Sequence, residues 1–391
     1  MKSGILPTQA AALPVGRVQA DRIDALKGVA CTLIVWHHLA AYGPMSDVVH
    51  LAAPGLINWL YDNARMAVQV FLVVGGFLSA GAMTRNQVAS HAAGPEHSAH
   101  PISRFARQIL QRFSRLAPAY WVALLVSVAV SAALRPWFEH PSVPDAPTWF
   151  QAAAHVLLLH DVLGQSALSA GIWYIAIDLQ LFALAALVCG LAWRSGTSFA
   201  TARRVAMAGT FALAALSLLV FNRQSALDIT ALYFFGAYGL GMLAFWATQL
   251  TNSRERLLWV GLLTAASLLA LWVDFRARIA LALTVALALV WLQQTPDRAG
   301  PGAALRRAAL APLAWLGKRS YAIFLIHFPV CLVFNAVLAQ AFPAQWWANA
   351  LGMVAAFGSS VLAGMLLHRH VEVGVRRKSA VPALAVAAAG R

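Results

Sequence analysis

Residues 171–193, GIWYIAIDLQLFALAALVCGLAW, form an apolar stretch whose single charged residue is Asp178. A helix needs about 17–25 mostly apolar residues to cross the hydrocarbon core of a membrane, and this stretch has that length. The same length test selects further stretches along the chain. Two of them, at 257–273 and 277–293, are separated only by a short turn. We therefore expect an all-α polytopic membrane protein with about ten transmembrane helices, at 28–44, 66–84, 117–134, 171–193, 205–222, 229–248, 257–273, 277–293, 320–341 and 346–368.

The composition of the whole chain supports this class. Of its 391 residues, 60% are hydrophobic and 11% are charged, and the mean hydropathy is +0.68. Soluble globular proteins have about 25% charged residues, and disordered chains lack this much apolar surface. Both classes are therefore excluded. Cys31, Cys189 and Cys331 each lie in an apolar stretch without CxxC spacing, so we expect buried thiols rather than a disulfide framework or a zinc site.

The formal net charge of +15 could indicate a nucleic-acid-binding protein, but the basic residues lie between the apolar stretches. If the N-terminus is cytoplasmic, 24 of the 29 lysines and arginines fall on the inner side. The outer side then has Arg65, Arg135, Arg223, Arg276 and Arg278. This bias follows the positive-inside rule. We therefore predict cytoplasmic termini, a multi-pass protein of a bacterial inner (cytoplasmic) membrane, and no nucleic-acid partner.

The spans divide the chain into three parts. Residues 1–27 are expected to form a cytoplasmic segment rather than a cleavable signal peptide, because a long polar or mixed stretch precedes the first apolar one. Residues 28–368 form the transmembrane domain, and residues 369–391 form a cytoplasmic tail too short for a second catalytic domain.

Two loops stand out. In the outer loop 135–170, the apolar stretch 155–163 is too short to cross, so we expect it to lie at the interface or to re-enter the membrane. The inner loop 86–103 contains His91, His97 and His100. Because a fourth ligand and a regular spacing are missing, a solvated linker explains this loop better than a metal site does.

Three ionisable residues fall inside predicted spans, where their cost makes each a functional candidate. At a rise of 1.5 Å per residue, His38 and His327 lie roughly 15 and 12 Å above the inner face, and Asp178 lies about 10 Å below the outer face. They can therefore share one cavity. His37 points roughly 100° away from His38, so we expect only one of the two to face the interior. His327 has an alternative structural role, which is to bind a carbonyl freed by Pro329.

Basic residues gather at the inner ends of the spans: Lys27, Arg112, Arg115, Lys318 and Arg319. Basic residues at the ends of spans usually set the orientation of the protein in the membrane, or they extend their charged ends to the membrane surface. Arg112 and Arg115, however, share a helix face and would suit a polyphosphate. In the second span, Gly75, Gly76, Ser79 and Ala80 are small residues that favour close helix packing.

The sequence resembles the acyltransferase-3 family of integral membrane O-acyltransferases in five blocks that follow the family's order. In the first, a basic residue precedes a histidine by eleven positions, here Lys27 and His38. The second has Gly75 where the family usually has Ser, and the fourth has Asp178 where it usually has Glu. The blocks are RIDALKGVA at 22–30, VFLVVGGFL at 70–78, RFSRLAPAY at 112–120, WYIAIDLQ at 173–180 and GKRSYAIFLIHFP at 317–329.

The resemblance implies transfer of an acyl group, commonly acetyl from acetyl-CoA, to a hydroxyl of a surface glycan or a lipid-linked sugar. Acyl-CoA is then a donor substrate, with no permanently bound cofactor and no metal, and membrane lipids surround the protein. Lys27, Arg112 and Arg115 are expected to receive the phosphates of CoA. The departures from the family pattern leave succinyl or longer acyl groups open. The residues expected to contact the acceptor are Trp173, Gln180, Tyr321 and His327.

In this scheme His38 is the general base that removes the proton from the acceptor hydroxyl, or a transient acyl carrier. Asp178 is expected to fix the tautomer of His38 or to hold the sugar. The His38 ring should then face the bundle interior, in reach of the arginine-lined inner mouth. A transporter or flippase for a polar substrate is the alternative from another class. Inverted repeats would favour it, but the two halves of the chain show no such symmetry.

Overall fold

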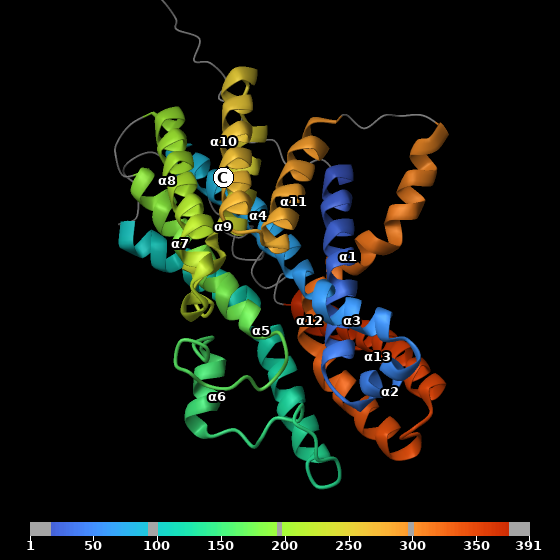
Figure 1. The fold of residues 1–391 in the computed structure, drawn as a ribbon. Coiled ribbons are helices and arrows are strands. Elements are labelled where there is room, and N and C mark those ends of the chain that lie inside the picture. The colour runs from blue at the N-terminus through green and yellow to red at the C-terminus, as the bar shows by residue number, and fades with distance from the viewer. Residues whose placement is uncertain (1–16, 93–100, 194–197, 296–300, 375–391) are drawn as a thin grey trace, which may run out of the picture.

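The computed structural model describes residues 17–92, 101–193, 198–295 and 301–374 (Figure 1). Outside these ranges lie residues 1–16 of the predicted N-terminal segment, 93–100 of the histidine-containing loop, and 375–391 of the predicted tail. Every regular element in the described ranges is a helix, which confirms the all-α class. They are α1 (Arg17–Ala41), α2 (Pro44–Ala52), α3 (Pro54–Asn63), η1 (Ala64–Ala67), α4 (Val68–Ala92), α5 (Pro101–Leu134), α6 (Trp149–Val156), α7 (Trp173–Ala192), α8 (Phe199–Leu219), η3 (Phe221–Arg223), η4 (Ser225–Leu227), α9 (Ala231–Thr248), α10 (Ser253–Val273), α11 (Ala277–Gln294), α12 (Pro301–Ala341), α13 (Trp346–Leu367) and η5 (His368–Glu372).

Nine helices within the described ranges are long and apolar enough to cross a membrane, which confirms a polytopic protein. The first predicted span is not among the nine. Its helix, α1, contains Asp24, Lys27 and two adjacent histidines, which lower its hydropathy. Two other helices run well beyond their predicted spans, α5 toward residue 101 and α12 toward residue 301.

Short helices occupy two segments between the spans. Residues 44–63 fold as α2 and α3, which the apolar pattern did not predict. In the outer loop, α6 has eight residues, far fewer than a membrane crossing needs. After α6 the chain turns at Leu158, whose φ of 59° is positive.

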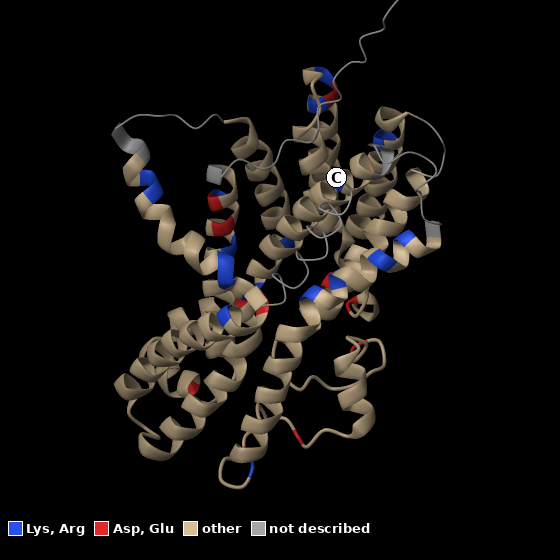
Figure 2. Ribbon diagram, turned by 180° about the vertical axis from the view of Figure 1, so that it is seen from behind, with Lys and Arg blue, Asp and Glu red and all other residues tan. Residues whose placement is uncertain are grey.

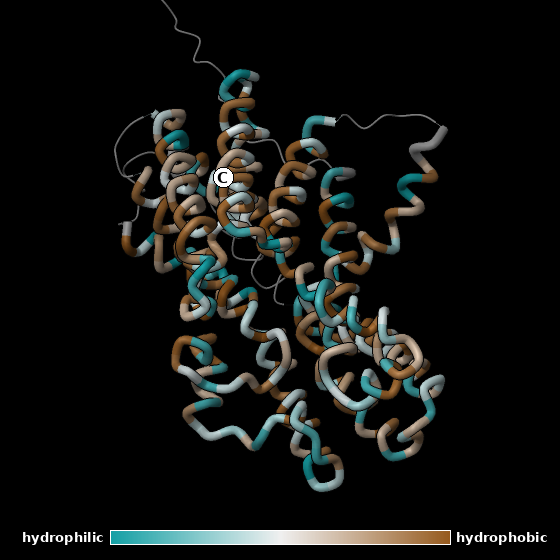
Figure 3. Tube along the Cα trace, in the orientation of Figure 1, coloured by the Kyte–Doolittle hydropathy of each residue, from teal (hydrophilic) through white to brown (hydrophobic). Residues whose placement is uncertain are grey.

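Charge and hydropathy give the bundle two distinct ends. Lys and Arg gather in the upper half of Figure 2, on the side where α1, α8, α10 and α12 begin (Figure 1). We call this side the inner end, and the side that holds α6 the outer end. Figure 3 shows hydrophobic residues along the helices and hydrophilic ones at helix ends and in loops. The three cysteines are buried and free, as predicted.

Helix α9 is the most buried helix among the candidate spans, at 89% of its apolar window. Glycines allow α4 to approach it closely. A side chain at Gly76 would collide with the backbone carbonyl of Tyr238, and one at Gly241 would collide with that of Val73. The prediction that the small residues of the second span serve close packing is therefore confirmed at Gly76.

A second glycine contact joins α1 to α12. Both helices start at the inner end and run side by side (Figure 1). A side chain at Gly28 would collide with the carbonyl of Leu313, and one at Gly317 with that of Asp24. The two helices are thus in register at Gly28 and Gly317. Residues ten positions on along each helix therefore lie at the same depth, about 15 Å beyond the glycines.

Candidate active site

The two residues ten positions beyond these glycines are His38 and His327, and their rings are in contact. The rings are stacked with centroids 4.8 Å apart, and Nδ1 of His38 lies 2.5 Å from Nε2 of His327. On the far side of the pair, Nδ1 of His327 lies 2.6 Å from the carbonyl oxygen of Phe324. The side chains are 7% and 0% exposed, so both rings face the bundle interior rather than lipid.

This chain of hydrogen bonds selects one tautomer for each neutral ring. The carbonyl of Phe324 can only accept, so Nδ1 of His327 must donate to it. Nε2 of a neutral His327 is then an acceptor, and Nδ1 of His38 donates to it. The lone pair of His38 is therefore on Nε2, which has no hydrogen-bond partner among the described residues. The arrangement presents an oriented imidazole base.

The alternative role considered for His327 was to bind a carbonyl freed by a proline. The ring does bind a backbone carbonyl, but that carbonyl belongs to Phe324. Pro329 removes the N–H that would bond four residues back, at Leu325. The position of the His327 ring therefore does not follow from Pro329, and the ring remains available to orient His38.

Gly171 closes the space beside the histidine pair. Its φ of +78° lies in the left-handed region, and a Cβ there would sit 3.1 Å from Cε1 of His38 and 2.8 Å from Cζ of Phe324. No signal in the sequence pointed to this residue, because Gly171 stands at the edge of the predicted span and outside the family blocks. A glycine at the start of α7 thus lets the loop pack directly against the proposed base.

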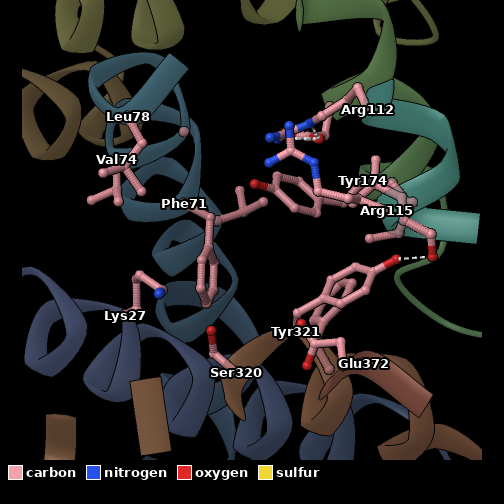
Figure 4. A pocket seen from close by; sticks show the side chains of 16 residues that line it. Lys27, Phe71, Val74, Leu78, Arg112, Arg115, Tyr174, Ser320, Tyr321 and Glu372 are labelled. Atoms are coloured by element: carbon pink, nitrogen blue, oxygen red, sulfur yellow. Dashed lines mark hydrogen bonds and ion pairs between the residues drawn. The ribbon is translucent and has the colours of Figure 1, made fainter. Parts of the chain in front are cut away.

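A cavity of about 270 Å³ lies on the inner side of the histidine pair. Figure 4 shows Arg112 and Arg115 on one wall, across from Lys27 and Phe71. Both arginines face it from α5, as their spacing predicted. Lys27 also forms an ion pair with Asp24 at 2.7 Å. The polar lining residues are Lys27, Arg112, Arg115, Tyr174, Asp178, Ser320, Tyr321 and Glu372, and the others are apolar or Gly75.

Of the two roles expected for Asp178, the structure contradicts the first, fixing the tautomer of His38, while the second, holding the sugar, stays a prediction. Its carboxylate binds Arg112 in a forked contact, with distances of 3.1, 2.8 and 2.6 Å. A charged guanidinium stabilises a buried carboxylate better than a neutral imidazole does, because the pair is charge-assisted and bidentate. The partner of His38 is His327 instead. Arg112, predicted to bind CoA phosphate, is already held by Asp178 at the cavity wall.

The remaining predicted acceptor residues are dispersed. Tyr321 lines the inner cavity and donates to the carbonyl of Leu116 at 2.8 Å (Figure 4). Trp173 lines a second cavity, at the outer end. Gln180 lines neither; its side-chain oxygen accepts the N–H of Ala231 at 3.1 Å and so caps the start of α9. Gln180 thus caps a helix, because the first N–H groups of a helix need acceptors. Its contact with the acceptor stays a prediction.

His38 is not among the residues that line the inner cavity, contrary to the expectation of direct access from the inner mouth. Phe324 lies between them. Its ring borders the cavity and packs 5.8 Å from the ring centroids of both His327 and Tyr174. Sequence reasoning also missed Glu372, which the continuation of α13 into η5 brings to the cavity although it falls in the predicted tail.

Comparison with known proteins gives one match. A family model described as an acyltransferase domain matches residues 21–369, nearly the whole chain. No curated protein and no solved structure matches significantly. The matched region contains the histidine pair, both arginines of the inner cavity and, apart from the last three residues of the ninth, the nine candidate spans within the described residues. The chain belongs to the acyltransferase-3 family and is a multi-pass membrane acyltransferase.

Proposed function

We propose that this protein is an O-acyltransferase that moves an acyl group, with acetyl as the first candidate, from acyl-CoA to a hydroxyl of a cell-surface glycan or lipid-linked sugar. Its proposed location is the inner membrane of a bacterium, with the inner end facing the cytoplasm. The observation that carries the proposal is the chain from Phe324 through His327 to His38, which leaves Nε2 of His38 as an oriented base inside the bundle.

In the proposed reaction, His38 first accepts one proton and later returns it. Nε2 takes the proton of the acceptor hydroxyl as its oxygen attacks the thioester carbonyl carbon, giving a tetrahedral intermediate. The carbon–sulfur bond then breaks, and the protonated His38 returns its proton to the leaving sulfur, which departs as free CoA. His327 stabilises the protonated ring of His38 through the Nδ1 hydrogen bond.

The inner cavity supports the choice of donor. Lys27 and Arg115 supply positive charge for the phosphates of CoA, while Phe71, Val74 and Leu78 give an apolar wall for the acyl chain (Figure 4). The Lys27–Asp24 ion pair is partly exposed, so a phosphate can replace it at small cost. To reach His38, the thioester must displace the ring of Phe324, which therefore acts as an aromatic gate between donor and base.

The decisive experiment uses purified full-length protein in detergent with radiolabelled acetyl-CoA and a glycan extract. Wild-type protein should transfer label to the glycan. His38→Ala should lower the rate by about 10²–10⁴-fold, while thermal stability and binding of CoA are retained. His37→Ala is the matched control, because His37 instead bonds to the carbonyl of Leu60. Normal transfer by His38→Ala would refute the base assignment. Vectorial movement of substrate without any labelled product would indicate a transporter.

A further inference from the structure

A second cavity lies at the outer end of the bundle. It has a volume of about 700 Å³, and α7, α9, α11 and the outer loops contribute to its walls. Trp173, Tyr233 and Phe234 supply aromatic surface. The charged residues that line it are Asp62, Arg65, Asp161, Asp228, Arg276 and Arg278. The motifs of the family blocks do not include any of these six.

The position of the arginines is unusual for a membrane protein. Only five basic residues of the chain fall on the outer side, and three of them line this one cavity. Because the positive-inside rule disfavours basic residues in short outer loops, insertion does not explain their presence there. Their convergence from two separate segments, before α4 and at the start of α11, indicates a shared role in the cavity.

The charges in the cavity do not neutralise each other directly. Within the described residues, no ion pair joins its three aspartates to its three arginines. Arg276 is held by the side-chain oxygen of Asn222 and the carbonyl of Leu218, at 2.6 and 2.8 Å. Arg276 also pairs with Asp274 at 3.4 Å, outside the lining, and Arg278 donates through Nη2 to the carbonyl of Asn222 at 3.1 Å. Oδ2 of Asp161 lies 3.4 Å from Nε2 of His160. The three carboxylates of the lining are thus left, within the described residues, without an arginine partner in the cavity, and they can accept hydrogen bonds from the hydroxyls of a polar ligand.

The lining also has the apolar surface that a sugar ring needs. Trp173 stacks on Phe234 with centroids 5.4 Å apart, and the guanidinium of Arg278 lies 4.9 Å above the ring of Tyr233. Aromatic faces can pack against the C–H face of a pyranose, while carboxylates and guanidiniums form strong charge-assisted hydrogen bonds with its hydroxyls. Three carboxylates against three guanidiniums give the lining no net formal charge, which favours a neutral ligand.

A short stretch of chain links the outer cavity to the histidine pair. Trp173 borders the cavity, and Gly171, two residues earlier, packs against His38. We infer that the outer cavity binds a neutral glycosyl residue of the acceptor and directs one of its hydroxyls toward His38. This inference rests on the proposed function only for the role of the sugar as acceptor. The binding of a sugar is testable without catalysis.

The test is protection of a cysteine from a membrane-impermeant maleimide. Ala277→Cys places an exposed thiol in the cavity lining, and the three native cysteines are buried. The full-length His38→Ala variant is the background, so no turnover is required. The sugar probes are methyl glycosides of glucose, galactose, mannose, rhamnose and N-acetylglucosamine, each at about 100 mM. Sodium sulfate at the same concentration, in a separate reaction, is the anion probe.

At least one glycoside should slow the labelling of the Ala277→Cys thiol several-fold, and a concentration about ten times the Kd would slow it by about tenfold. The double variant Asp161→Asn, Asp228→Asn should abolish this protection. The control is Ser225→Cys, an exposed outer position away from the cavity, where labelling should not change. If no glycoside changes the labelling rate of the Ala277→Cys thiol from its value without sugar, or if sulfate alone protects the thiol, the inference is overturned. Protection combined with failure of glycan transfer would refute the acceptor role but leave the sugar site standing.

Discussion

His38 and His327 lie 289 residues apart in the chain and share a hydrogen bond of 2.5 Å between Nδ1 and Nε2. The packing of two parallel helices at Gly28 and Gly317 places the two histidines at the same depth, because each lies ten residues beyond its glycine. His327 in turn is fixed by the carbonyl of Phe324. Two spans and one backbone carbonyl thus orient the proposed base, without a carboxylate.

His327 should act as a positioning residue for His38. We expect His327→Phe, which keeps an aromatic ring but no hydrogen bond, to lower the rate of acyl transfer by about 10–100-fold. His327→Gln keeps an acceptor for Nδ1 of His38 and should retain more activity. The KM for acetyl-CoA should stay constant in both variants, while the pH profile of kcat should shift. Equal activity of His327→Phe and wild type would contradict the role.

The Arg112–Asp178 pair should contribute mainly to stability. Asp178→Asn leaves a guanidinium in the bundle without its counter-charge, and breaking such a pair costs about 3–5 kcal/mol. Asp178→Glu preserves the charge and should lower Tm less. The double variant Arg112→Gln, Asp178→Asn should be more stable than either single charge-removing variant. If Asp178→Asn keeps its Tm but loses acyl transfer, the aspartate takes part in the chemistry instead.

Arg115 should act on the donor. We expect Arg115→Ala to raise the KM for acetyl-CoA by about tenfold, the effect of losing one charge-assisted contact of roughly 1.4 kcal/mol. The kcat and Tm should change little. Arg107→Ala is the matched control, since Arg107 is an exposed arginine of the same helix that does not line the inner cavity. An unchanged dependence of the rate on acetyl-CoA concentration in Arg115→Ala would exclude the contact.

Gly171 should be required for access to His38. Gly171→Ala forces a methyl group between His38 and Phe324, so we expect a large loss of kcat. The control is Gly164→Ala, because Gly164 also has a positive φ, of 64°, but nothing lies within 4 Å of an added Cβ. Both variants incur the left-handed backbone strain of about 1–2 kcal/mol. Equal activity losses in the two would show that strain, rather than crowding at His38, is responsible.

The outer loop should lose stability in acid. Burial lowers the pKa of His155 to about 4, because removal from water disfavours the charged ring, although the hydrogen bond to the carbonyl of Gln151 acts in the opposite direction. Burial likewise lowers the pKa of His160, which stacks on it at 4.2 Å, to about 4. An unfolded histidine titrates near pH 6.5. The stabilisation from the neutral rings is therefore complete above about pH 6.5 and is lost as the pH falls toward 4.

Hydrogen exchange of residues 135–170 can measure this effect by comparing neutral pH with about pH 5. Asp161 has a pKa that burial raises, so it acts in the opposite direction, but one carboxylate opposes two imidazoles. His160→Phe is the informative variant, because neither nitrogen of His160 has a hydrogen bond and the stacking is kept. It should reduce the acid-induced increase in exchange. An identical pH response in wild type and variant would exclude His160 as a contributor.

The sequence alone determined the membrane architecture and the depth of the functional groups. Apolar length locates the nine candidate spans of the described residues, and the bias of 24 inner to five outer basic residues predicts their direction, because insertion depends on these local quantities. The helical rise placed His38 and His327 at similar depths, and the spacing of Arg112 and Arg115 put them on one face. The count of basic residues on each side also shows the outer arginines. Because they depart from the positive-inside rule, they could have indicated the outer cavity from the sequence.

Only the tertiary structure decided which groups meet. Depth along a helix says nothing about which neighbour a side chain faces, since that depends on how the helices rotate and pack. The glycine contact of α1 with α12 gave His38 the partner His327. The packing of α5 against α7 brought Arg112 into contact with Asp178. For the same reason, only the folded chain could show Phe324 between the inner cavity and the base, and three distant arginines around one outer cavity.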